Sequence, residues 1–131
     1  HSEINNGDVP VHMLQIWIHP NQRNAAPKYQ QIQCDPREQP NQWHVIAGPN
    51  ADALMHIRQQ AEVKSALLEK AQALDVIAAQ RINYLHVISG AIQVAEHTVN
   101  AGDAIAFAES ARIEALEDAQ VIWFDLPEMK N

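Results

Sequence analysis

The chain begins with two side chains of the kinds that bind metal ions. The sequence starts His1-Ser2-Glu3, which places an imidazole and a carboxylate two positions apart. On a β-strand, residues two apart point to the same side, so both groups would face one site. Imidazole nitrogens and carboxylate oxygens are both ligands of divalent metal ions in proteins. His1 and Glu3 are therefore the first candidate ligands.

The rest of the sequence offers no comparable ligand spacing. It contains no His-x-His pair, and the histidines after His1 are His12, His19, His44, His56, His86 and His97. It also lacks a glycine-rich phosphate loop and the Gly-x-Ser-x-Gly, Cys-x-x-Cys and His-Glu-x-x-His motifs. The single cysteine, Cys34, excludes both an intrachain disulfide and a thiolate zinc cage.

Length and composition predict one compact globular domain. The chain has 131 residues, of which 47% are hydrophobic and 19% charged. Lysine and arginine number 9 against 16 aspartates and glutamates, which gives a formal net charge of −7. A negative protein repels nucleic acid and anionic membranes, so neither is an expected partner.

Short β-forming runs separated by turn residues dominate the pattern. A strand is predicted at 11–18, between Pro10 and Pro20, and another before the Gly48-Pro49-Asn50 turn. Further strands are predicted within 82–90, 100–107, 111–116 and 119–127, and a strand or a hairpin is predicted at 91–99. Many short strands at close spacing are typical of a β-sandwich or β-barrel.

Residues 61–80 allow two interpretations. This stretch, AEVKSALLEKAQALDVIAAQ, consists mainly of helix formers, and its apolar residues recur at near-helical spacing. The alternative is two strands, AEVKSALLE and ALDVIAAQ, joined by a turn near 70–73. Local sequence does not decide between them.

Three segments together resemble the pirin family. HSEINN followed by VHMLQIWIHP and PKYQQ resembles the segment that joins the two halves of pirin-like proteins. YLHVISGAIQV followed by VNAGDAIAF is similar to the strand–glycine–strand and Gly-Asp turn of a cupin barrel. The closing VIWFDLP resembles the end of the bacterial pirin-like branch. The resemblance spans nearly the whole chain, and it favours two strands over a helix at 61–80.

The resemblance implies a metal site that this chain holds only in part. Pirin-like proteins are bicupins whose N-terminal barrel binds a metal, usually iron, through three histidines and one glutamate. His1 and Glu3 match the last two ligands, whereas the early His-x-His is absent. The chain therefore resembles the C-terminal part of such a protein. Some bacterial members are flavonol dioxygenases, called quercetinases.

The cupin ligand spacing, laid over the second barrel from Gly90, predicts no metal there. The ligand positions fall on Val76, Ala78 and Ile82, and the last falls near Ala115. The same register places Tyr84 and His86 on one face together with Ile82 and Ile88, which we expect to point into the barrel. Tyr84 and His86 would then line a small polar pocket for a ligand, or form a buried pair satisfied by backbone or water.

These expectations define a fold and two functional hypotheses. We expect an all-β, cupin-type barrel of the jelly-roll kind at 35–131, preceded at 1–34 by leftover strands of an N-terminal cupin barrel. The first hypothesis is the metal-free, non-catalytic scaffold half of an iron-dependent quercetin 2,3-dioxygenase; the second is a small-molecule-binding or regulatory module. The missing N-terminal barrel is the expected partner. Unpaired edges at 11–18 predict a homodimer or a strand swap, and the resemblance implies a cytoplasmic location.

Overall fold

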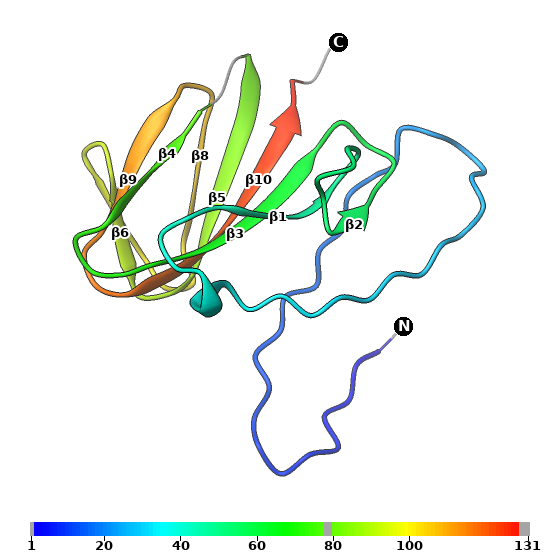
Figure 1. Ribbon diagram of the computed structural model, residues 1–131, viewed down its shortest axis with the longest axis horizontal. Helices are drawn as coiled ribbons and strands as arrows, with labels where there is room; N and C mark the ends of the chain where they lie inside the picture. The colour runs from blue at the N-terminus through cyan, green and yellow to red at the C-terminus, as the bar shows by residue number, and fades with distance from the viewer. Residues whose placement is uncertain (1, 78–79, 129–131) are drawn as a thin grey trace.

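A computed structural model describes residues 2–77 and 80–128, and it consists of two β-sheets packed face to face (Figure 1). The larger sheet has the strand order β2-β1-β3-β10-β5-β8, and the smaller sheet has the order β4-β9-β6-β7. The elements are η1 (Pro36–Glu38), β1 (His44–Gly48), β2 (Met55–His56), β3 (Glu62–Leu68), β4 (Ala73–Val76), β5 (Arg81–Ser89), β6 (Ala91–Val94), β7 (His97–Asn100), β8 (Ala104–Phe107), β9 (Ala111–Ala115) and β10 (Ala119–Pro127). The predicted all-β cupin fold is confirmed.

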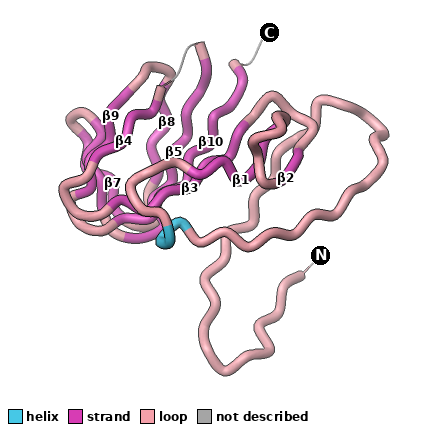
Figure 2. Tube along the Cα trace, in the orientation of Figure 1, coloured by secondary structure: helices cyan, strands magenta, loops and turns pink. Residues whose placement is uncertain are grey.

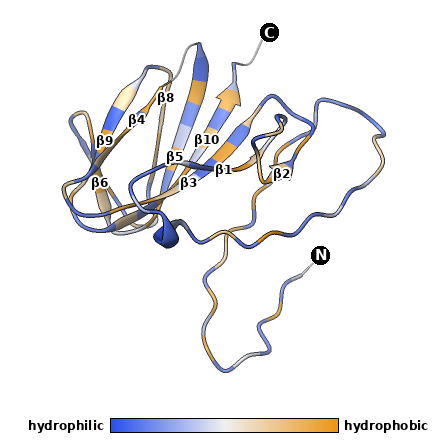
Figure 3. Ribbon diagram, in the orientation of Figure 1, coloured by the Kyte–Doolittle hydropathy of each residue, from blue (hydrophilic) through white to orange (hydrophobic). Residues whose placement is uncertain are grey.

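The main hydrophobic core lies between the two sheets. Alternate residues of β3, β5 and β10 point toward the smaller sheet, and Figure 3 shows the resulting alternation of apolar and polar positions along β5 and β10. Leu68, Leu85 and Val121 from the larger sheet meet Ile92 and Ile113 from the smaller one, and all five are fully buried. Their burial is the main force that holds the sheets together.

The disputed stretch at 61–80 forms strands β3 and β4, as the resemblance implied. β3 lies between β1 and β10 and bonds to both, so tertiary pairing outweighs the helix propensity of its residues. The turn between β3 and β4 closes with a hydrogen bond from the Gln72 amide to the Glu69 carbonyl (2.9 Å). The Asp118 carboxylate accepts a hydrogen bond from the Lys70 amide (2.8 Å) and ties this turn to the start of β10.

The strand predicted at 11–18 is not present. No strand precedes β1 in the part of the chain that the structure describes, and residues 2–34 run as the loop drawn in pink in Figure 2. No neighbouring strand bonds to 11–18, and a lone strand without a partner is not stable. The strands expected within 1–34 are therefore absent from residues 2–34, whose backbone is irregular. That residues 1–34 are the end of an N-terminal cupin barrel remains a prediction.

Part of this segment nevertheless docks on the outer face of the larger sheet. Ile18 packs against a second apolar cluster, around Val63 and Ile122, on the face that points away from the smaller sheet. The Gln30 side-chain amide bonds to both backbone groups of His56, at 2.7 and 2.9 Å, as a paired strand would. Residues 18–30 are thus anchored beside β2.

The barrel proper is preceded by the short 3-10 turn η1. The Asp35 carboxylate caps it by accepting a hydrogen bond from the Arg37 amide (3.0 Å). Hydrogen bonds from the Arg37 side chain also hold the pKa of Asp35 below its ordinary value. This turn lies beside the expected domain boundary between 34 and 35, which remains a prediction.

No helix in the described ranges has the length and apolarity needed to cross a membrane.

Candidate functional site

The terminal ligand pair is only partly described. His1 lies outside the described residues, whereas Glu3 is exposed on the irregular segment, beside a hollow of about 350 Å³ that it shares with Ile4, Val11 and Met13. Nothing within the described ranges brings three histidine, cysteine, aspartate or glutamate side chains close enough to hold a metal ion. Glu3 therefore needs ligands from elsewhere to complete a metal site.

The positions that correspond to cupin ligands in the barrel are apolar. Val76 and Ala115 point into the core and are fully or nearly fully buried. Ile82 is half-buried on β5, and Ala78 lies outside the described residues. Apolar side chains in these places offer no lone pairs to a cation. A metal-free second barrel remains a prediction that agrees with this.

Tyr84 and His86 do not point into the barrel, so the predicted face of β5 was wrong. Tyr84 is 41% exposed, and its ring lies 5.9 Å from that of Phe124 on the outer face of the larger sheet. Asn83, Leu85 and Val87 are the buried residues of β5. Ligand binding by Tyr84 and His86 remains a prediction, now for an outer surface.

A β-bulge explains the error. Val121 of β10 pairs with Val87, but the adjacent Gln120 pairs with Ser89, so Ile88 is an extra residue in β5. The cupin ligand spacing was counted back along the sequence from Gly90, so the count crossed this bulge. A shift of one residue exchanges the two faces of a strand, so every residue before the bulge was assigned to the wrong side.

The corrected register makes a prediction about stability. Replacing Val87 by threonine should lower the free energy of unfolding by about 2 kcal/mol, because a hydroxyl of nearly the same size enters the core without a partner. Replacing Tyr84 by threonine should cost less than about 1 kcal/mol, because that position is half-exposed. Urea denaturation of both variants measures the difference, and equal costs would contradict the register.

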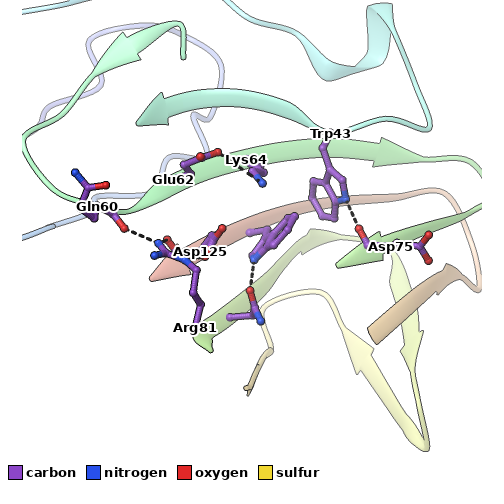
Figure 4. A network of polar contacts seen from close by, with 9 residues as sticks. Trp43, Gln60, Glu62, Lys64, Asp75, Arg81 and Asp125 are labelled. Atoms are coloured by element: carbon purple, nitrogen blue, oxygen red, sulfur yellow. Dashed lines mark hydrogen bonds and ion pairs between the residues drawn. The ribbon is translucent and has the colours of Figure 1, made fainter. Parts of the chain in front are cut away.

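A polar network lies at one end of the barrel (Figure 4), and no local sequence motif indicates it. Arg81 of β5 forms an ion pair with Asp125 of β10 and also donates to the Gln60 carbonyl. Lys64 of β3 lies 3.6 Å from the Glu62 carboxylate. Each of these two cations is paired with a carboxylate: Arg81 and Asp125 join β5 to β10, whereas Lys64 and Glu62 pair within β3.

Two tryptophans pack together in the main core beside Lys64. The Lys64 ammonium lies 4.0 Å from the centroid of the Trp123 ring, a cation–π distance. The Trp123 indole donates to the buried Asn83 side-chain oxygen (2.8 Å), and Trp43 meets Trp123 edge to face at 5.1 Å. Trp43 in turn donates to the Asp75 carbonyl (3.0 Å). These contacts join β3, β4, β5 and β10 around the two indoles and indicate a packed, structural interior.

Comparison with known proteins identifies the family. Residues 45–126 match the family model described as the quercetinase C-terminal cupin domain. Quercetin 2,3-dioxygenase from Escherichia coli O157:H7 is 30% identical over an alignment 132 residues long, which covers 97% of this chain and 56% of that protein. The chain therefore spans about half the length of the curated relatives it matches.

Solved structures show the same fold. The crystal structure of YhhW from Escherichia coli superposes with a TM-score of 0.77 at 23% identity and covers 88% of this chain and 50% of that one. The bacterial pirin YhhW in complex with nickel(II), also from Escherichia coli, gives a TM-score of 0.75 at 22% identity, covering 84% and 48%. The chain belongs to the pirin-like proteins, and it carries their quercetinase C-terminal cupin domain.

Proposed function

We propose that this chain is the scaffold half of a pirin-like flavonol dioxygenase and that His1 and Glu3 complete the metal site of a preceding barrel. The observation that carries the proposal is the match of residues 45–126 to the quercetinase C-terminal cupin domain. The half-length coverage of the quercetin 2,3-dioxygenase from Escherichia coli supports a second, N-terminal cupin barrel as the partner.

The described residues by themselves do not fit a metal ion, because Glu3 is the one ligand of the proposed set among them. We therefore assign no step of the reaction to this chain. Its barrel would pack beside the metal-bearing barrel, and the exposed segment with Glu3 would reach into that site. Iron is the metal that we propose for the intact protein; the nickel complex of a bacterial pirin supports a divalent ion more generally.

The experiment starts from the longest reading frame that contains this sequence. We expect it to encode a barrel with His-x-His ahead of His1, and the purified product to consume quercetin and dioxygen. The variant Glu3→Gln should lower metal affinity by about tenfold or more, because it removes an anionic ligand. Glu96→Gln changes the same charge at an exposed turn and serves as the control.

The outcomes separate the parts of this proposal. A reading frame with no preceding barrel would contradict the scaffold role. A metal-loaded protein without quercetin turnover would refute the flavonol activity and favour a regulatory role. Equal metal affinity of the Glu3→Gln and Glu96→Gln variants would show that Glu3 is not a ligand.

Two further properties belong to the same proposal. Residues 11–17 expose several large apolar side chains, namely Val11, Met13, Ile16 and Trp17. We expect them to be covered by the preceding barrel or, in this chain alone, by a second copy that forms a homodimer or exchanges the segment. Light scattering that shows only monomer for this chain would contradict the second alternative. We also propose a cytoplasmic location for this protein, which its membership of the pirin-like proteins supports.

A further inference from the structure

The barrel has an opening on its side, between strands β7 and β8. These strands follow one another through a turn at Gly102, yet β7 is the edge of the smaller sheet and β8 is the edge of the larger one. The two edges are not hydrogen-bonded to each other, and a cavity of about 630 Å³ lies between them. We call this cavity the side pocket.

The inner wall of the side pocket is apolar. Val94 and Val99 of the smaller sheet and Ile105 and Phe107 of the larger one line it, and all four belong to or pack against the main core. A volume of this size falls in the range of small-molecule sites. Phe107 supplies an aromatic face, and the two edge strands supply backbone donors and acceptors that no neighbouring strand uses.

The rim of the side pocket selects by charge. His97, Asp103 and Glu109 are the charged or titratable residues among those that line it, and the described lining includes no lysine or arginine. Two carboxylates without a lining cation repel an anionic ligand and attract a cationic one. The net charge of −7 for the whole chain acts in the same direction.

The side pocket lies away from the segment that would face a preceding barrel. Residues 18–30 dock beside β2, at the far end of the larger sheet from β8, and Figure 1 shows β6, β8 and β9 on the opposite side of the molecule from the N-terminal segment. The strand order places β2 and β8 at opposite edges of the larger sheet. Docking of the N-terminal segment therefore leaves the side pocket open.

We propose that the side pocket binds a small aromatic molecule that is neutral or positively charged. The ring would lie against Phe107 and the valines, and its polar or cationic group would lie at the rim beside Asp103 and Glu109. Ligand binding here does not depend on a metal or on the proposed dioxygenase activity. It would give this half of the protein a binding site of its own, separate from the one that Glu3 serves.

Three probes with the same ring test the proposal on the whole chain: naphthylmethylamine, naphthylmethanol and naphthoate. Each is titrated into the labelled protein, and shifts of backbone amide signals are followed by NMR. We expect the amine and the alcohol to shift the amides of Val94, Val99 and Phe107. Naphthoate should bind about fivefold more weakly or worse, and added salt should reduce this difference.

Two sets of variants locate the binding. Ala111 lines the side pocket and is half-buried, so Ala111→Phe should fill the cavity and weaken binding of the amine by about tenfold or more. If that variant does not fold, the Asp103→Asn/Glu109→Gln variant still tests the rim, because it should remove most of the preference for the amine over naphthoate. Glu114→Gln, on the exposed face of β9, is the matched control and should keep the preference.

Several results would overturn the proposal. One is the absence of amide shifts with every probe up to its solubility limit. Another is tight binding of naphthoate, equal to that of the amine. A third is binding that persists in folded Ala111→Phe with shifts centred on other residues, which would place the ligand outside the side pocket.

Discussion

Replacing Gly90 by alanine is expected to lower the free energy of unfolding by more than about 3 kcal/mol. Gly90 joins β5 to β6 with a φ of 78°, a conformation that costs an L-residue about 1 kcal/mol or more. A Cβ at this position would lie 2.1 Å from the Asp118 carbonyl oxygen and 2.8 Å from the Ala119 Cα. Because both neighbours are backbone atoms at the start of β10, the strand itself would have to move.

Gly102 provides a matched control for this prediction. Its φ of 88° is similar, but a Cβ there would meet nothing within 4 Å. Gly102→Ala should therefore cost only the conformational strain, about 1 kcal/mol. Urea denaturation of the two variants separates backbone strain from steric contact. Equal losses of stability would mean that β10 yields easily and would contradict the close packing of Gly90.

Truncation of Trp123 to alanine should destabilise the barrel by about 5 kcal/mol. Removing a buried tryptophan costs about 3–5 kcal/mol through lost contacts and the cavity left behind. The side chain is 3% exposed, and it also accepts the Lys64 cation–π contact and donates to Asn83. Its loss leaves the Asn83 oxygen buried without that donor, which adds about 1 kcal/mol or more.

The measurement uses far-UV circular dichroism during denaturation, since the substitution changes tryptophan fluorescence. Trp17→Ala is the control, because Trp17 is 79% exposed and should change stability by less than about 0.5 kcal/mol. Trp123→Phe keeps the ring and loses the indole donor, so it should cost about 1–2 kcal/mol even if the alanine variant does not fold. Similar stabilities of the Trp17 and Trp123 alanine variants would contradict the structural role that we assign to the Trp123 side chain.

The sequence predicted the architecture better than the orientation of individual side chains. Turn residues and β-forming runs located β5 to β10 closely, because these signals are local. The two strands at 61–80 needed the family resemblance, since their residues favour a helix and only pairing with β1, β9 and β10 decides otherwise. The strand expected at 11–18 failed for the converse reason, because a strand-like sequence forms no strand without a partner.

The positions of Tyr84 and His86 depend on the register of β5, which local sequence does not set. The single extra residue at Ile88 is invisible in composition, yet it exchanged the two faces of β5 and moved Tyr84 and His86 out of the barrel. The Trp43–Trp123–Lys64 cluster joins residues far apart in sequence, so no local pattern indicates it. The side pocket likewise arises from two strand edges that fail to pair, which only the topology reveals.

The central claim is that the metal site belongs to a preceding barrel and that this chain supplies only part of its ligands. Elemental analysis of the purified chain, prepared without a histidine tag and after exposure to iron(II) and nickel(II), tests this most directly. We expect far less than one metal ion per chain, because Glu3 and His1 provide too few ligands. One tightly bound ion per chain would contradict it. A His1→Ala variant would then show whether that ion sits at the terminus or in the barrel.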